Sequence, residues 1–99
     1  MEDLQLTERR FADRVPFALQ VMIVYGELAW AADVLDLSEG GCGVFRPAGC
    51  LLRVGNVSRL LFFQGCGPAV PVSARIAWIN DRHIGFEYHE PQAIPPCPP

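Results

Sequence analysis

Two short segments carry side chains that could together hold a small anion. Arg10-Phe-Ala-Asp-Arg14 places two guanidinium groups four residues apart, and Asp36-Leu-Ser38-Glu-Gly-Gly41 adds a carboxylate, a hydroxyl and a glycine-rich turn. Guanidinium groups bind phosphate and the acceptor edge of guanine bidentately, whereas a carboxylate accepts hydrogen bonds from the donor edge of that base. Glycines let backbone N–H groups approach a ligand without an intervening Cβ. The two segments therefore predict a site for a small phosphorylated ligand.

The segments that must position these residues have the alternating pattern of β-strands. Apolar residues recur with a period near two, in runs separated by glycine, proline and acidic residues, which predicts an all-β protein. Six antiparallel strands of this kind are expected to close into a small barrel, because closure removes exposed sheet edges. The expected strands span residues 16–25, 28–37, 42–45, 57–64, 70–78 and 83–88.

A hairpin between the first two strands would bring the two motifs together. Gly26-Glu27 predicts its tight turn. Because Arg14 precedes the first strand and Asp36 ends the second, both are expected at the same rim of the barrel. Alternation also predicts which large aromatic side chains lie in the core, and it favours core packing over ligand contact for the last tryptophan. These expected core aromatics are Trp30, Phe62, Trp78 and Phe86.

The order of the motifs resembles the PilZ domain family, whose members carry RxxxR followed by (D/N)xSxxG and act as bacterial receptors for cyclic di-GMP. The resemblance runs from Arg9 to Tyr88, and the last two strands, with Arg75-Ile-Ala-Trp78 and Gly85-Phe-Glu-Tyr88, are similar to the family's closing RxxW and GxxF. Tyr88 stands where phenylalanine is usual. The resemblance implies a six-stranded antiparallel PilZ-type β-barrel at residues 15–90 and a flexible N-terminal arm at 1–14. The prolines that follow predict a Pro-rich C-terminal tail at 91–99, where many members of the family carry a helix.

The resemblance also implies how cyclic di-GMP would be bound. Arg10 and Arg14 would clamp guanine edges and phosphates, while Asp36 and Ser38 would hold the other guanine edge. Arg9 would stack between bases and favour capture of two intercalated messengers. The full set of expected ligand contacts is Arg9, Arg10, Arg14, Asp36, Ser38 and Gly41.

The implied function is that of a receptor and adaptor. Binding is expected to order the arm and so change the surface shown to a downstream protein. The process controlled, whether motility, polysaccharide synthesis, biofilm formation or virulence, is not encoded in these residues. The alternative is a PilZ-like adaptor between proteins that does not bind the messenger. Such an adaptor would be expected to carry damaged motifs, and both motifs are intact here.

Composition excludes several other classes of function. The 99 residues suffice for one small domain, and the formal net charge of −3 argues against binding along DNA or RNA. An oligonucleotide-binding barrel would also expose aromatic side chains among basic ones, whereas the large aromatic side chains named above are expected in the core. All 8 basic side chains are arginine, so an anion site must use planar guanidinium groups.

Four cysteines and two histidines show no spacing typical of a zinc site, so we expect no metal and no cofactor beyond the messenger. An enzyme is not expected either, because Cys42, next to the glycine turn, has no nearby histidine in the sequence to act as a base. No secretion signal and no apolar run of about 18 residues is present. We therefore expect a cytoplasmic protein with reduced thiols and no membrane insertion.

Overall fold

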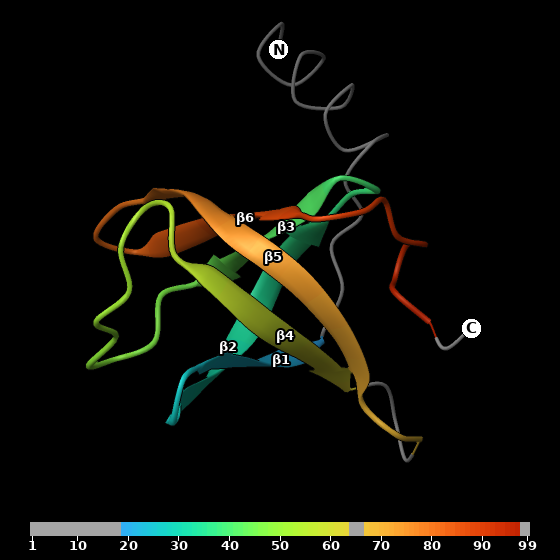
Figure 1. Ribbon diagram of the computed structural model, residues 1–99, viewed down its shortest axis with the longest axis horizontal. Coiled ribbons are helices and arrows are strands. Elements are labelled where there is room, and N and C mark those ends of the chain that lie inside the picture. Colours follow the sequence, from blue (N-terminus) through green and yellow to red (C-terminus); the bar gives the residue numbers. More distant parts are fainter. Residues whose placement is uncertain (1–18, 64–66, 98–99) are drawn as a thin grey trace, which may run out of the picture.

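Six antiparallel strands form a closed barrel in a computed structural model that describes residues 19–63 and 67–97 (Figure 1). Around the barrel the strands follow the order β1-β2-β3-β6-β5-β4, and β4 pairs with β1 to close it. The predicted all-β, six-stranded antiparallel barrel is confirmed, while the expected arm at residues 1–14 lies outside the described residues. The strands are β1 (Gln20–Tyr25), β2 (Leu28–Leu37), β3 (Gly41–Phe45), β4 (Val57–Phe63), β5 (Val70–Ile79) and β6 (His83–Tyr88).

The hairpin that joins β1 and β2 turns where the sequence predicts. Tyr25 pairs with Leu28, and Gly26 between them has a φ of +62°, a conformation that costs glycine little. Gly26 thus permits a two-residue turn whose twist matches that of the strands. Val21 and Ile23 of β1 point into the core, with exposed fractions of 1% and 0%.

The inward faces of all six strands fill the barrel with apolar side chains. Phe62 and Phe86 are buried as predicted, whereas Trp30 is only partly buried and packs against the edge of the core. The largest fully buried side chains on the strands are Val21, Ile23, Leu37, Val44, Leu60, Phe62, Ile76 and Ile84. The interior of the barrel is therefore a packed apolar core.

Two β-bulges interrupt the alternation and decide which polar and aromatic side chains leave the core. In β2 the register shifts between Val34 and Asp36, and in β5 it shifts between Ile76 and Trp78. Each bulge inserts one unpaired residue, so the side chains beyond it exchange faces. Asp36, which strict alternation would carry inward with Val34, lies on the outer face, and Leu37 is buried instead.

The predicted core position of Trp78 is wrong for the same reason. Val70, Val72, Ala74 and Ile76 alternate into the core as expected, but the bulge then turns Trp78 outward, where it is 41% exposed. The bulge has no marker in the sequence, because Ile76-Ala-Trp78 contains no glycine or proline.

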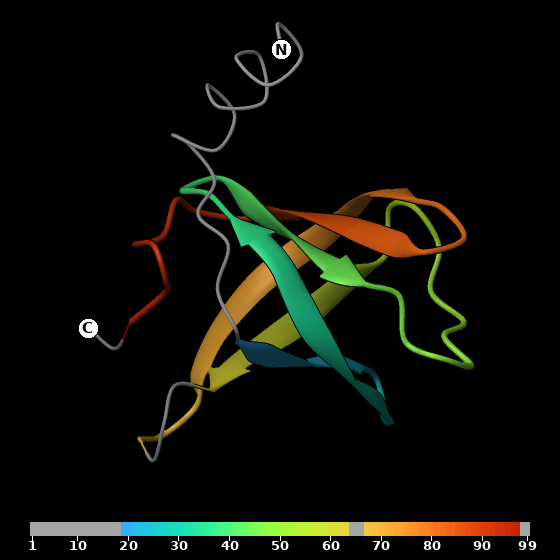
Figure 2. The same ribbon diagram turned by 180° about the vertical axis from the view of Figure 1, so that it is seen from behind.

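The chain after β6 lies against the barrel next to the β2–β3 turn, as the two opposite views show (Figures 1 and 2). The Gln92 backbone N–H donates a hydrogen bond to the Glu39 carbonyl at 2.9 Å. Ile94 packs against the core, and Pro96 is buried. The tail segment therefore shares main-chain contacts with the turn that carries one of the two motifs.

Candidate ligand-binding site

The turn between β2 and β3 is closed by Ser38 and Gly41. The Ser38 N–H donates to the Gly41 carbonyl at 2.9 Å, and the Gly41 N–H donates to Ser38 Oγ at 3.2 Å. Ser38 Oγ also lies 3.2 Å from the Gly41 carbonyl oxygen, to which its hydroxyl donates. The Ser38 side chain thus fixes the shape of the turn, as serine often does by binding local backbone groups.

Gly41 is required by a close approach of two strands. A Cβ at this position would collide with the backbone carbonyl of Phe86 on β6. At Gly40, by contrast, a Cβ would meet nothing within 4 Å. The last glycine of the motif therefore allows β3 and β6 to pair closely at this end, whereas the glycine before it is not needed for packing.

Asp36 is held over Gly43, the second glycine of β3. Its Oδ1 accepts a hydrogen bond from the Gly43 N–H at 3.1 Å. A Cβ on Gly43 would lie 3.0 Å from that same oxygen, so a larger residue would push the carboxylate away. The half-buried carboxylate is thereby fixed on the outer surface of the barrel.

Strand pairing places Asp36 and Trp78 at the two ends of one row across four strands. Asp36 pairs with Gly43, Gly43 with Gly85, and Gly85 with Trp78. The Trp78 indole lies over Gly85, where a Cβ would collide with the ring. A carboxylate and an indole therefore border a floor of two glycines, and the row is about 14 Å wide at the usual strand spacing. We call this row the glycine shelf.

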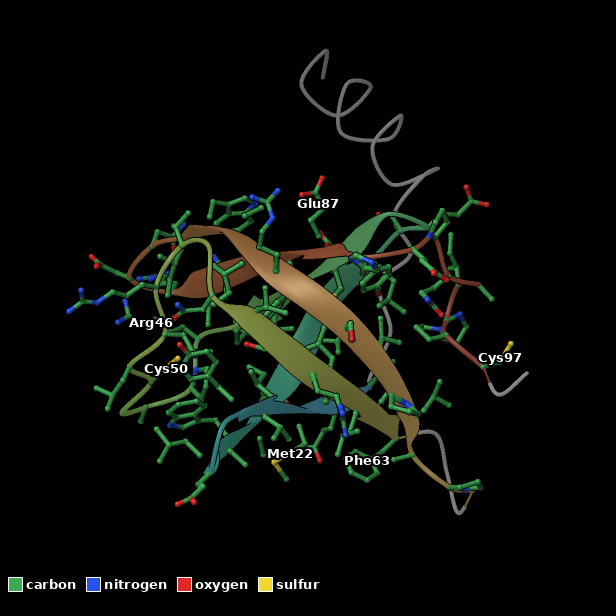
Figure 3. The ribbon with its side chains drawn as sticks, in the orientation of Figure 1. Met22, Arg46, Cys50, Phe63, Glu87 and Cys97 are labelled. Carbon is green, nitrogen blue, oxygen red and sulfur yellow. The ribbon has the colours of Figure 1, made fainter. Side chains whose placement is uncertain are left out.

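The next outward-facing row adds an ion pair beside the shelf. Gly41 pairs with Glu87, and Glu87 pairs with Arg75. Arg75 Nη2 donates to Glu87 Oε1, and the two side chains are 56% and 57% exposed. Figure 3 shows Glu87 pointing away from the barrel into solvent. An exposed pair of this kind adds little stability, so a change of partner by either group would cost little.

Next to the turn lies Tyr88, a buried tyrosine whose hydroxyl is in an unusual environment. The Tyr88 N–H donates to the Gly40 carbonyl at 2.8 Å, and the ring packs edge-on against Phe62. Its hydroxyl makes no hydrogen bond of ordinary geometry within the described residues. Burial raises the pKa of this hydroxyl strongly, and the neighbouring Cys42 thiol and the Asp36 carboxylate raise it further.

Tyr88→Phe should therefore raise the free energy of unfolding by about 1 kcal/mol at neutral pH, because it removes a buried polar group without a good partner. The tyrosine protein should also lose stability above about pH 10, since the unfolded chain releases the phenolic proton there while the folded chain keeps it. The expected slope is about 1.4 kcal/mol per pH unit relative to the variant. Urea unfolding of both proteins at pH 7, 10 and 11 measures this slope. Free energies of unfolding that change with pH in parallel in the two proteins would contradict the prediction.

The structure brings together three of the six predicted ligand contacts. Asp36, Ser38 and Gly41 lie in and beside one turn, whereas Arg9, Arg10 and Arg14 fall outside the described residues. Sequence reasoning missed the glycine shelf and its neighbouring ion pair. Gly43 and Gly85 were a usable signal, because glycine inside a strand often marks a close approach by a ligand or another group.

The described residues contain no group of three or more His, Cys, Asp or Glu side chains that could hold a metal. Within the same part of the chain, no helix has the length and apolar character needed to cross a membrane. None of the three described cysteines forms a disulfide within the described residues: Cys42 and Cys50 are buried, and Cys97 is exposed.

Comparison with known proteins gives one family match and two similar folds. The family model described as PilZ domain matches residues 8–95. The structure of the Bacillus subtilis inhibitor of motility MotI/DgrA is similar, with a TM-score of 0.66 and 23% identity over 83% of this chain, which spans 43% of that structure. The PilZ domain of CeSA from a cellulose-synthesizing bacterium has a TM-score of 0.65 and 21% identity, covering 76% of this chain and 78% of the other. No curated protein matches the sequence significantly.

Proposed function

This chain belongs to the PilZ family, and from that membership we propose that it is a cytoplasmic receptor that binds cyclic di-GMP on the glycine shelf and signals to another protein. PilZ domains are binding and adaptor domains rather than enzymes. The observation that carries the proposal is the row from Asp36 to Trp78, which offers a base-reading carboxylate and a stacking ring at the two ends of a floor made by two paired glycines.

Each group on the shelf matches one part of the messenger. Asp36 would accept hydrogen bonds from the N1–H and N2–H donors of a guanine. Trp78 would stack on a base, an interaction of about 1–3 kcal/mol. Arg75 lies one row away and would turn from Glu87 toward a phosphate, a charge-assisted contact that guanidinium groups make well.

The arm would complete the site from above. Arg10 and Arg14 would clamp guanine edges and phosphates, and Arg9 would stack between bases if two messengers bind. Ser38 and Gly41 would act mainly through the shape of the turn, as their mutual hydrogen bonds support. Ordering of the arm would then change the surface available to a downstream protein.

Calorimetric titration with cyclic di-GMP tests this proposal, with GTP as a specificity control. We expect saturable binding by the native chain and none by Arg10→Ala/Arg14→Ala. The matched control is Arg53→Ala/Arg59→Ala, which removes the same charge from exposed positions outside the four strands of the shelf and should bind normally. If the native chain binds two messengers, Arg9→Ala should reduce the stoichiometry to one.

The outcome that would overturn the proposal is absence of heat with the native chain, together with unchanged NMR shifts on a folded sample. That result would favour the adaptor that does not bind the messenger. Equal weakening in both double variants would instead assign the arginines a general charge effect rather than direct contacts.

A further inference from the structure

Three hollows in the outer wall formed by β4, β5 and β6 meet at Ser73, on the middle strand of that wall (Figure 1). One, of about 360 Å³, is lined by Ser73, Arg75 and His89, and another, of about 380 Å³, by Ser73, Arg59 and the β1–β2 turn. The third, of about 250 Å³, lies between Ser73 and the chain after β6. Sites for small molecules typically have volumes of about 300–1,000 Å³, so this wall has room for a ligand outside the glycine shelf.

Strand register surrounds Ser73 with hydrogen-bond donors. Ser73 pairs with Arg59 of β4, and the His89 N–H donates to the Ser73 carbonyl at 2.9 Å from the other side. Arg75 is two residues further along β5 and leaves the same face of the strand. All four residues are exposed. Cβ atoms of directly paired residues are about 5 Å apart, and alternate residues of one strand are about 7 Å apart. The three longer side chains can therefore reach one group placed over the Ser73 hydroxyl.

Two guanidinium groups lie beside each other in this cluster. Arg59 and Arg75 are diagonal neighbours on adjacent strands, and Arg59 has no ion-pair partner in the part of the chain that the structure describes. Arg75 pairs with Glu87, which lies on β6, the neighbour of β5 on the side away from Arg59. Like charges at this separation repel each other, so an anion between the two guanidinium groups would lower the electrostatic energy of both.

The donors of the cluster fit a phosphate group better than a carboxylate. A phosphate monoester carries close to two negative charges at neutral pH and three acceptor oxygens. These match two guanidinium groups, the Ser73 hydroxyl and a ring N–H of His89. A carboxylate carries one charge and is satisfied by one bidentate guanidinium. Val57 lines both larger hollows and is 65% exposed, so it offers an apolar contact to the organic part of an ester.

We propose that Arg59, Ser73, Arg75 and His89 form a second anion site, which binds the phosphate group of a phosphomonoester. A small phosphorylated metabolite and a phosphoserine of another protein share this chemistry. Arg59 is on β4, which contributes nothing to the glycine shelf, and only Arg75 is common to this site and the proposed messenger site. The two sites are therefore adjacent but separate.

Titration of the ¹⁵N-labelled native chain with inorganic phosphate to about 20 mM, at constant ionic strength and without cyclic di-GMP, tests the site. We expect saturable shifts of the amide signals of Arg59, Ser73 and His89, and at least tenfold weaker binding of acetate. Arg59→Ala should weaken phosphate binding at least tenfold. The matched control is Arg82→Ala, which removes the same charge at the β5–β6 turn, beyond the far end of β5 from Ser73, and should bind phosphate normally. Glycerol 3-phosphate and a phosphoserine peptide, titrated in the same way, distinguish the two sources by their relative affinities.

Ser73→Val tests the centre of the site without changing its charge. The substitution removes the hydroxyl and adds methyl groups where the three hollows meet, at an exposed strand position that suits a β-branched residue. Phosphate binding should fall at least tenfold while the unfolding transition is retained. Absence of saturable shifts in the native chain, equal affinity for acetate, or native phosphate affinity in Arg59→Ala would each overturn the site. Arg59→Ala should still bind cyclic di-GMP, so the second site and the proposed function can fail separately.

Discussion

Gly41→Ala should lower the free energy of unfolding by about 3 kcal/mol, as expected for overpacking against atoms that cannot move aside. The new methyl group would meet the backbone carbonyl of Phe86 on the paired strand. Relief requires β3 and β6 to separate where Gly41 pairs with Glu87. Separation would also disturb the Ser38 turn, so messenger affinity should fall together with stability. Urea unfolding and calorimetric titration of the same sample measure both effects.

Gly40→Ala is the matched control. The residue is adjacent, its φ is not in the positive range, and a Cβ there would meet nothing within 4 Å. Its stability should stay within about 0.5 kcal/mol of the native value, as for ordinary surface substitutions. Equal destabilisation by the two substitutions would show that general turn flexibility, rather than the contact with Phe86, makes Gly41 necessary.

Trp78→Ala should weaken binding of cyclic di-GMP by about 5- to 150-fold, because loss of one base-stacking ring costs about 1–3 kcal/mol. Stability should change much less, since the indole lies outside the barrel over Gly85. Trp78→Phe should retain most of the affinity, because it keeps a flat ring. The measurement is the dissociation constant from calorimetric titration.

Phe63→Ala provides the comparison for an exposed aromatic away from the glycine shelf. Trp78 and Phe63 are both 41% exposed, so each substitution removes an aromatic ring with the same exposed fraction. Only Trp78→Ala should lower the affinity for the messenger. Unchanged affinity in Trp78→Ala would place the ligand away from the shelf's tryptophan end and restrict the site to the turn and the arm.

Strand positions and the closed barrel followed from alternation because each strand has one face in a common core. Alternation did not predict the faces of the residues beyond the two bulges, because a single unpaired residue reverses the face of every residue that follows it. Trp78 was misplaced for this reason. Asp36 was correctly placed at the strand end, but its outward direction depended on the bulge after Val34.

The candidate site was predictable in part. The turn motif identified Asp36, Ser38 and Gly41 as neighbours, because they are close in sequence. The glycine shelf joins residues of four strands that are far apart along the chain, and only strand register aligns them. Gly43 and Gly85 each indicate a close approach to a strand, but the sequence does not show that these two glycines are adjacent.

Closure of the barrel has a consequence for how a signal can leave this molecule. Each of the six strands has two hydrogen-bonded neighbours, so a partner could add a strand of its own only where one strand extends beyond its neighbour, as the first half of β2 extends beyond β3. Recognition by main-chain pairing is thus confined to such strand ends. Elsewhere a partner must distinguish the bound from the free state by the side chains on the wall or by the segments that lie across the barrel's ends, where Gln92 already touches the Glu39 carbonyl of the motif turn.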